Sequence, residues 1–253
     1  MPTCEDLRLG GTLSGSGITG GVTINQTNLA VDDWSDIFGH GGLSYTPVEV
    51  LGRAGAYPVG DGLPLARFPT LNMRLRSAHQ CPPGEDLTDT FLALLADSGG
   101  QYLEVDIPDE GSRFIKVYGL TPASILQPRQ IRTVKVPLFS PDPYWKEGGA
   151  QNTDTISGAD SLAVGGVVNV YDAVLVFAGD GALVHNDLDW TLTISGSSGP
   201  VTVDLGNRTV TMGGNPADYV LGPSSRHWGW FIPGTNSLSS SVSTTVTWRD
   251  QYN

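Results

Sequence analysis

Apolar and polar residues alternate along much of the chain with the period of two that is typical of half-buried β-strands. Leu71, Met73 and Leu75 alternate with polar neighbours in this way. The same pattern predicts a hairpin over residues 102–118 and a strand over 130–138. Shorter strands with frequent turns between them are predicted at residues 173–178, 190–194, 201–205, 209–212 and 242–248. We therefore expect a mainly β protein built from antiparallel β-sandwiches.

Pro137 lies inside the strand predicted at 130–138. Proline has no backbone N–H group to donate to a neighbouring strand, so it is usually confined to the edges of sheets. We therefore expect this strand to lie at an edge.

One helix is predicted, over about residues 85–97. Its sequence begins after a Pro-Pro-Gly segment and ends before Gly99-Gly100, which are suitable start and stop signals. Leu87, Phe91 and Leu94 fall on one face at helical spacing. Because an apolar helix face needs a surface to pack on, we expect this helix to cover the first sandwich.

A proline-aromatic segment is predicted to join two domains. It consists of Pro141, Asp142, Pro143, Tyr144 and Trp145. The prolines exclude a helix or a central strand, and the aromatic pair is too apolar to leave in water. The sequence after it becomes rich in Gly, Ser, Asp and Thr, as at the start of a new unit. We expect an N-terminal domain over residues 1–146 and a C-terminal domain over 147–253.

The charge balance narrows the range of partners. The 253 residues carry 26 acidic and 14 basic side chains, a formal net charge of −12. Phosphate backbones and anionic membrane surfaces repel such a chain, which argues against specific binding to nucleic acid. The 33 glycines and 17 prolines favour short strands joined by tight turns over a helical fold.

The two cysteines and the N-terminus bear on where the protein is made. Cys4 and Cys81 are too few to staple two domains, so we expect free thiols and synthesis in a reducing compartment. The first residues have no basic region followed by an apolar one, so no secretory signal is expected. No apolar run reaches the roughly 20 residues that span a bilayer, so we expect no membrane anchor.

Three clusters that could carry chemistry lack the required spacing. The glycines between residues 10 and 21 are not followed by the Lys-Ser or Lys-Thr pair of a phosphate loop, and they predict turns and a flexible arm. Asp32, Asp33 and Asp36 do not match a calcium-binding loop. The His and Cys within residues 79–81 are too few for a zinc site. We expect no metal and no cofactor.

Four carboxylates raise the question of hydrolysis. Glu104 and Asp106 alternate along a predicted strand, and Asp109 and Glu110 lie in the turn that follows. Two carboxylates facing each other in a cleft could hydrolyse a glycosidic bond. Acidic residues are equally typical of the polar face of a strand and of turns, and we favour that structural interpretation over a hydrolase.

Trp228 and Trp230 lie on the same side of a segment whose next residue, Phe231, points the opposite way. Exposed tryptophans on a β-sandwich can stack on sugar rings, so a glycan site is one interpretation. Packing in the core or at a protein interface is the other, and the alternation favours it.

Five sequence features together resemble the distal tail protein family of long-tailed, non-contractile bacteriophages, which are components of the phage tail and baseplate hub. They are the helix ending in Leu94-Leu95 with the hairpin after it, the segment 139–145, Val203-Asp204-Leu205 with Arg208-Thr209-Val210, the segment 230–236, and Val246-Thr247-Trp248-Arg249 with Tyr252. These features cover most of the chain in the family's order.

This resemblance implies that the N-terminal domain assembles as a homohexameric ring that continues the tail tube, and that the C-terminal domain is a galectin-like sandwich on the outside. Such a ring joins the tail tube protein and the tape-measure protein to the tail-tip hub protein, with receptor-binding proteins attached in some members. The family has no catalytic residue, so we expect a structural virion protein and not an enzyme.

The resemblance also places the protein at the virion tail tip, after synthesis in the cytoplasm of the host bacterium. The acidic balance fits a ring that lets DNA pass without binding it specifically. The alternative from another class is a carbohydrate-binding module that binds host cell-wall glycan through Trp228 or Trp230.

Overall fold

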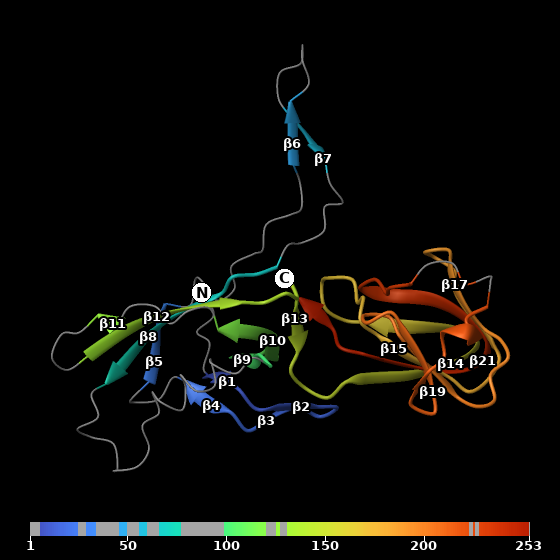
Figure 1. Cartoon of the computed structure of the whole chain (residues 1–253), viewed down its shortest axis with the longest axis horizontal. Coiled ribbons are helices and arrows are strands. Elements are labelled where there is room, and N and C mark those ends of the chain that lie inside the picture. The colour runs from blue at the N-terminus through green and yellow to red at the C-terminus, as the bar shows by residue number, and fades with distance from the viewer. Residues whose placement is uncertain are drawn as a thin grey trace. The chain divides into compact units, whose positions relative to one another are not determined.

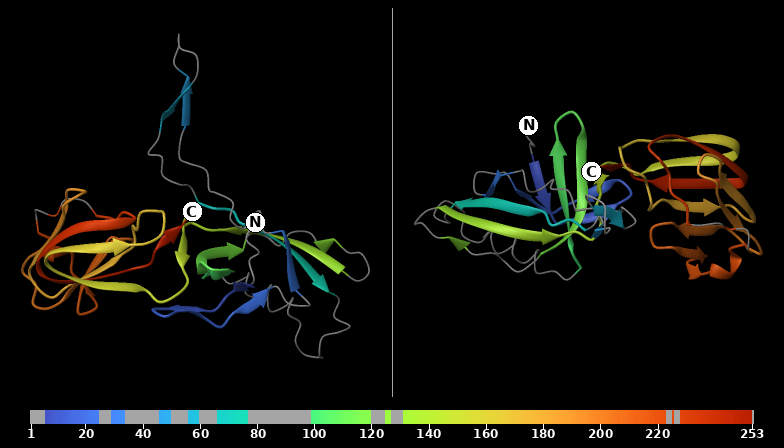
Figure 2. Two further views of the ribbon diagram at one scale, coloured as in Figure 1. Left: turned by 180° about the vertical axis from the view of Figure 1, so that it is seen from behind. Right: turned by 90° about the horizontal axis from the view of Figure 1, so that it is seen from above.

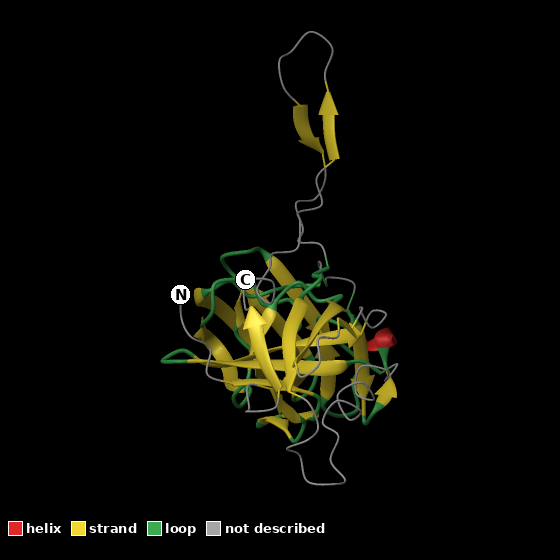
Figure 3. Ribbon diagram, turned by 90° about the vertical axis from the view of Figure 1, so that its left-hand side faces the viewer, coloured by secondary structure: helices red, strands yellow, loops and turns green. Residues whose placement is uncertain are grey.

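In the computed structural model of the chain, the residues described are 6–24, 29–33, 46–49, 56–59, 66–76, 99–119, 125–126, 131–222, 225 and 228–252. Within them strands dominate, and the short 3₁₀ helix η2 (Asp218–Val220) is drawn red in Figure 3. The mainly β fold of antiparallel sheets is therefore confirmed. The chain divides into two compact units, Met1–Gly149 and Ala150–Tyr252.

The first unit is organised around one antiparallel sheet (Figure 1). Its strands are β1 (Asp6–Leu9), β2 (Thr12–Ser14), β3 (Gly17–Thr19), β4 (Val22–Ile24), β5 (Leu29–Asp33), β6 (Thr46–Glu49), β7 (Ala56–Val59), β8 (Thr70–Arg76), β9 (Gln101–Ile107), β10 (Gly111–Gly119), β11 (Ile125–Leu126), β12 (Ile131–Phe139) and β13 (Trp145–Glu147). The sheet order is β4-β1-β9-β10-β12-β8-β5. β11 adds to β12 and β13 adds to β10, while β2–β3 and β6–β7 form two separate hairpins.

Alternation along the central strands builds the core of this unit. Leu103, Val105 and Ile107 of β9 are at most 6% exposed. In β10 Ile115 and Val117 are 1% exposed. These are the inward positions that the period of two predicts, and the predicted hairpin over 102–118 is observed as β9–β10.

The prediction that Pro137 marks an edge strand is wrong. β12 lies between β10 and β8 in the sheet. On one side β8 pairs along Ile131–Pro137, and on the other side β10 pairs only with Leu138 and Phe139 and β11 only with Thr133 and Val134. Pro137 therefore lies where the ladder on one side is interrupted, which is where a missing N–H donor is tolerated.

The helix predicted at 85–97 lies outside the described residues and stays a prediction. The same holds for the galectin-like character of the second unit, which the strand order alone does not identify.

The second unit is also antiparallel throughout its described strands. They are β14 (Asn152–Val164), β15 (Val174–Phe177), β16 (Gly181–His185), β17 (Trp190–Ile194), β18 (Val201–Asp204), β19 (Thr209–Met212), β20 (Asn215–Pro216), β21 (Gly234–Trp248) and β22 (Gln251–Tyr252). The strand order is β17-β16-β21-β15-β18-β19-β20, and β14 pairs with β21 as well. In both views of Figure 2 the yellow β14 and the red β21 run side by side.

β21 changes neighbours along its length. Its first part pairs with β16 as far as Ser240, and from Thr244 onward it pairs with β15. Between these two ladders the hydroxyls of Ser240 and Thr244 lie 2.6 and 3.2 Å from the carbonyl oxygen of Val242. Opposite, β14 has a register shift between Ile156 and Gly158. Because a bulge bends a strand, the paired strands β14 and β21 can contribute to both layers of a sandwich-like unit.

The core of the second unit is aromatic and aliphatic. Trp190, Phe177 and Phe231 are its largest fully buried side chains. They pack with the inward residues of the neighbouring strands, such as Leu175 and Val203, which are 0% exposed. Their summed burial is the main stabilising term of this unit.

β14 was not predicted from the sequence, and β21 begins eight residues before the predicted strand at 242–248. In β14 only Ile156, Leu162 and Val164 are buried among 13 residues. Hydrogen bonding to β21 therefore defines this strand, and alternation of apolar residues does not.

β14 is an edge strand whose free backbone groups are partly capped. In the described part of the chain its only strand neighbour is β21. The N–H of Thr155 donates to Asp154 Oδ1 and the N–H of Ser161 donates to Asp160 Oδ1, both at 2.8 Å. These two donors are thus engaged by side-chain oxygens, and the two aspartates also place negative charge on the edge, which disfavours edge-to-edge association.

Replacing both Asp154 and Asp160 with alanine should promote self-association beyond that of the unaltered chain, because two edge donors become free to pair. Static light scattering over a concentration series would measure it. The matched control is the double change to asparagine, which keeps the acceptor oxygen and removes the charge. If the asparagine variant associates as strongly as the alanine variant, charge repulsion and not capping protects this edge.

Candidate interaction sites

The proline-aromatic corner is ordered by the side chain of Asp142. The N–H of Tyr144 donates to Asp142 Oδ1 at 3.0 Å, and Lys146 Nζ lies 2.8 Å from Asp142 Oδ2. Ser140 Oγ donates to the Asp142 carbonyl oxygen at 2.8 Å. An aspartate that bonds a backbone N–H two residues later is a common way to fix a turn. Asp142 is therefore the residue that sets the course of the corner between Pro141 and Pro143.

The corner packs into the first unit. Trp145, which was predicted to be anchored, is 1% exposed. Its strand β13 pairs with β10, with Lys146 opposite Phe114. At the following Gly148, whose N–H donates to Ser112 O at 2.7 Å, an added Cβ would lie 2.1 Å from Ser112 Oγ. The end of the first unit is thus closely packed up to Gly148.

Arg67 lies beside the corner. Its backbone exchanges two hydrogen bonds with Ser140, at 2.9 and 2.8 Å, and the residue is 3% exposed. Burial lowers the pKa of its guanidinium, whereas Asp142 and Tyr144 act in the opposite direction. Its Nε and Nη1 atoms have no hydrogen-bond partner in the described part of the chain. The guanidinium group of Arg67 is therefore held by packing and by attraction to Asp142.

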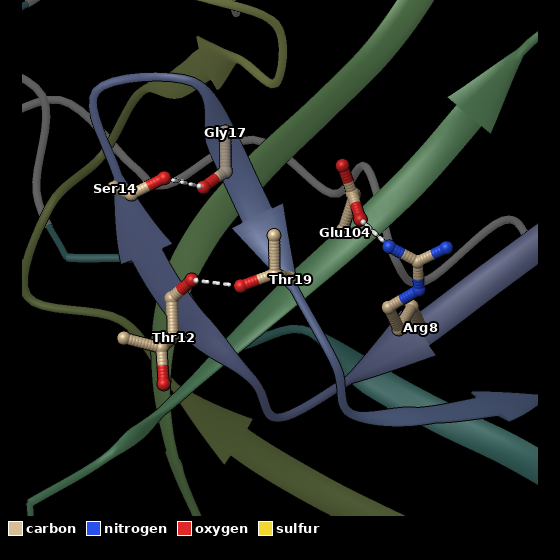
Figure 4. A network of polar contacts seen from close by, with 6 residues as sticks. All are labelled: Arg8, Thr12, Ser14, Gly17, Thr19 and Glu104. Carbon is tan, nitrogen blue, oxygen red and sulfur yellow. Dashed lines mark hydrogen bonds and ion pairs between the residues drawn. The ribbon is translucent and has the colours of Figure 1, made fainter.

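Two of the four candidate hydrolytic carboxylates, Glu104 and Glu110, make ion pairs. Glu104 Oε2 accepts from Arg8 Nη1 at 3.0 Å across β1 and β9, as Figure 4 shows. Glu110 pairs with Arg113 in the turn that also contains Asp109. Figure 4 also shows the neighbouring β2–β3 hairpin, which is closed by hydroxyl bonds to backbone carbonyls. This arrangement matches the structural interpretation of these acids, and Asp106 is an exposed residue of the same strand face.

The candidate metal ligands fall mostly outside the described residues. Asp36, His79 and Cys81 are not described, and of Asp32 and Asp33 only the backbone of β5 is described. Among the described residues no group of three or more His, Cys, Asp or Glu side chains could hold a metal ion. No helix in the described part of the chain is long and apolar enough to cross a membrane.

The two candidate tryptophans lie in different surroundings. Trp228 is partly buried and packs against the core cluster of the second unit. Trp230 lies beside Tyr171, with ring centroids 6.1 Å apart and an angle of 36° between the planes. Phe231, which follows Trp230 in the chain, is 0% exposed. It points to the side opposite Trp230, as the alternation predicted. The structure therefore separates Trp228 from Trp230 and brings Tyr171 to Trp230.

A buried polar network supports this region. His185 and Asn236 are both 0% exposed, and His185 Nε2 lies 2.9 Å from Asn236 Oδ1. The N–H of Leu188 donates to His185 Nδ1 at 3.3 Å, which assigns Nδ1 as the acceptor and leaves Nε2–H to donate to Asn236 Oδ1. Asn236 Oδ1 also accepts from the N–H of Ile232 at 2.8 Å. One amide thereby fixes the segment before β21.

Asp180 caps an exposed turn of the second unit. Ser197 Oγ–H donates to its carboxylate, as do the N–H groups of Ser197 and Gly196. These bonds hold the pKa of Asp180 below its ordinary value. Since the folded-state pKa is depressed, the contribution to stability is present above the ordinary aspartate pKa and is lost as the pH falls through the folded value.

Tyr171, His185 and Asn236 were not identified from the sequence. His185 lies two residues after Leu183, at an inward position of β16. A polar residue at a position where the alternation expects an apolar one could have pointed to it. The partnership with Asn236 joins residues 51 positions apart and has no local signature.

Gly148→Ala should destabilise the protein by about 1–3 kcal/mol, because its Cβ would clash with Ser112. Chemical denaturation followed by tryptophan fluorescence would measure the free energy of unfolding. Gly149→Ala is the matched control, since a Cβ there meets nothing within 4 Å. Equal stability of the two variants would contradict the close packing at Gly148.

Asn236→Ala should lower the free energy of unfolding by about 2 kcal/mol or more, because it leaves the Ile232 N–H and the His185 Nε2–H without an acceptor. The exposed Asn215, whose amide lies 3.4 Å from the Gly213 carbonyl oxygen, is the control. Asn215→Ala should change stability by less than about 0.5 kcal/mol. Thermal and urea unfolding would test both, and a neutral Asn236→Ala would show that the network is dispensable.

Comparison with known proteins identifies the fold. No protein-family model matches the chain, and no curated protein sequence matches it significantly. The crystal structure of SPP1 Dit (gp 19.1) is similar with a TM-score of 0.66 at 12% identity, over 98% of this chain and 99% of that chain. A chain of the phage P2 baseplate in its activated conformation with Ca is similar with a TM-score of 0.54 at 7% identity, over 97% of both chains. The same baseplate with Sr gives 0.52 at 8% identity, over 96% and 97%. The resemblance expected from the sequence is thus confirmed for the fold, which this chain shares with SPP1 Dit and a phage P2 baseplate chain.

Proposed function

We propose that the chain is a structural component of a bacteriophage tail tip and acts as a distal tail protein. The observation that carries this proposal is the similarity to SPP1 Dit, which extends over both compact units and nearly all of both chains. SPP1 Dit is described as a paradigm of the hub adsorption apparatus in phages that infect Gram-positive bacteria. The phage P2 similarity points to the same kind of assembly, since that chain belongs to a baseplate.

In this proposal the N-terminal domain, residues 1–146, forms a homohexameric ring, and the C-terminal domain, residues 147–253, is a galectin-like sandwich on its outside. The ring joins the tail tube and tape-measure proteins to the tail-tip hub, and it offers a platform for receptor-binding proteins. Made in the host cytoplasm, the protein acts at the virion tail tip. The net charge of −12 supports passage of DNA through the ring without binding.

The role is scaffolding and not catalysis. Glu104 is paired with Arg8 and Glu110 with Arg113, so two of the four carboxylates considered for hydrolysis are engaged in ion pairs. Asp109 lies in the turn between β9 and β10 with a φ of 66°, a backbone position typical of tight turns. These environments support a structural use of the acidic residues.

The ring is tested by the mass and symmetry of the full chain. At high concentration, light scattering should report particles of six 26.7 kDa protomers, and negative-stain images should show six-fold rings. If ring contacts are too small to hold alone, the same rings should form when the tail tube and hub proteins are added. A chain that stays monomeric at every concentration and with those partners would refute the proposal.

A further inference from the structure

An aromatic pair lies on the outer side of a short bridge in the second unit. Val170 and Phe231 exchange two backbone hydrogen bonds, at 2.8 and 3.0 Å, and both side chains are 0% exposed. Because neighbouring residues of an extended chain point to opposite faces, Tyr171 and Trp230 are directed outward on the other face. Their ring centroids are 6.1 Å apart, and Tyr171 is 36% exposed.

The backbone beneath Trp230 is fixed by buried polar groups. Trp190 Nε1–H donates to the carbonyl oxygen of Trp230 at 3.0 Å. The next outward residue, Ile232, has its N–H and its carbonyl bound by the amide of Asn236, at 2.8 and 2.9 Å. Since Asn236 and Trp190 are at most 1% exposed, the outward side chains stand on a rigid support.

The described residues on the outer face of this bridge carry an amide and no charged group. Asn169 Nδ2 donates to the Tyr171 hydroxyl at 3.0 Å, which orients the phenol ring. In the register of the bridge, Asn169 lies opposite Ile232 on the same face as Tyr171 and Trp230. The four residues therefore present two aromatic rings, one aliphatic chain and one carboxamide, without a charge.

We propose that Asn169, Tyr171, Trp230 and Ile232 form a binding site for an uncharged pyranose sugar. One face of a pyranose is made of C–H groups that stack on aromatic rings, and its hydroxyls bond to amide and phenol groups. Two tilted rings match one or two sugar residues in size. The proposal does not depend on the tail-tip function.

The substitutions can be made without disturbing the support. The bond from Trp190 goes to the backbone carbonyl of residue 230, so Trp230→Ala leaves its acceptor in place. Tyr219, which is 73% exposed in the same unit, provides a matched control for loss of a surface aromatic ring. Trp230→Phe keeps an aromatic face of smaller area.

The experiment titrates the full chain with the methyl glycosides of glucose, galactose, N-acetylglucosamine and rhamnose, using saturation-transfer NMR and calorimetry. At least one glycoside should bind, with affinity reduced about tenfold or more by Trp230→Ala and by Tyr171→Ala. Trp230→Phe should retain part of the affinity, and Tyr219→Ala should bind like the unaltered chain. Thermal unfolding of each variant shows whether it is folded.

Two outcomes overturn the proposal. One is the absence of binding by any of the four glycosides at about 10 mM, or binding that Trp230→Ala leaves unchanged. The other is an unaltered chain that shows no sugar response, together with a Trp230→Ala chain that is folded but fails to assemble with other tail proteins, which would identify the pair as a protein contact. Neither result changes the outcome of the test for a hexameric ring, because that test measures the mass and symmetry of particles formed by the unaltered chain.

Discussion

The second unit depends on one requirement, that backbone groups buried beside its core find partners away from water. The Asn236 amide meets this requirement at the start of β21. Its Oδ1 accepts from Ile232 and His185, and its Nδ2 lies within 3.3 Å of the carbonyl oxygens of Leu162, Ile232 and Gly234. These contacts join β14, β16 and the segment that carries Phe231. A buried network that is fully satisfied favours one arrangement of the strands around it.

In the first unit, close packing performs the corresponding role. Trp145 is buried and Gly148 approaches Ser112 too closely for any side chain. Gly17 of the β2–β3 hairpin likewise leaves no room for a Cβ beside the carbonyl of Gly148. The corner that Asp142 orders therefore packs as part of the first unit. The close approach of Gly148 to Ser112 and Gly17 lies at the end of that unit. A segment that is ordered before it binds a partner loses less conformational entropy on association.

The distribution of surface features fits a protein that works through contacts. Two of the four acids considered for hydrolysis, Glu104 and Glu110, are paired with arginines, and two N–H groups of the edge strand β14 are capped by its own aspartates. By contrast, Tyr171 and Trp230 lie outward on a rigid support. A shared fold does not assign a ligand to such a pair, because function resides in sites carried by folds.

The sequence by itself determined the mainly β character, the central strands and the placement of Trp230 on the face opposite Phe231, because alternation and turn residues act locally. It also carried the motifs that resemble distal tail proteins. Only the tertiary structure decided that Pro137 lies in an internal strand, that β14 is a strand at all, and that Tyr171 meets Trp230. Each of these depends on a partner far away in the chain: the ladder gap beside β12, the hydrogen bonds to β21, and the bridge from Val170 to Phe231. Such pairings follow from how strands are arranged in space, and no local pattern of residues specifies them.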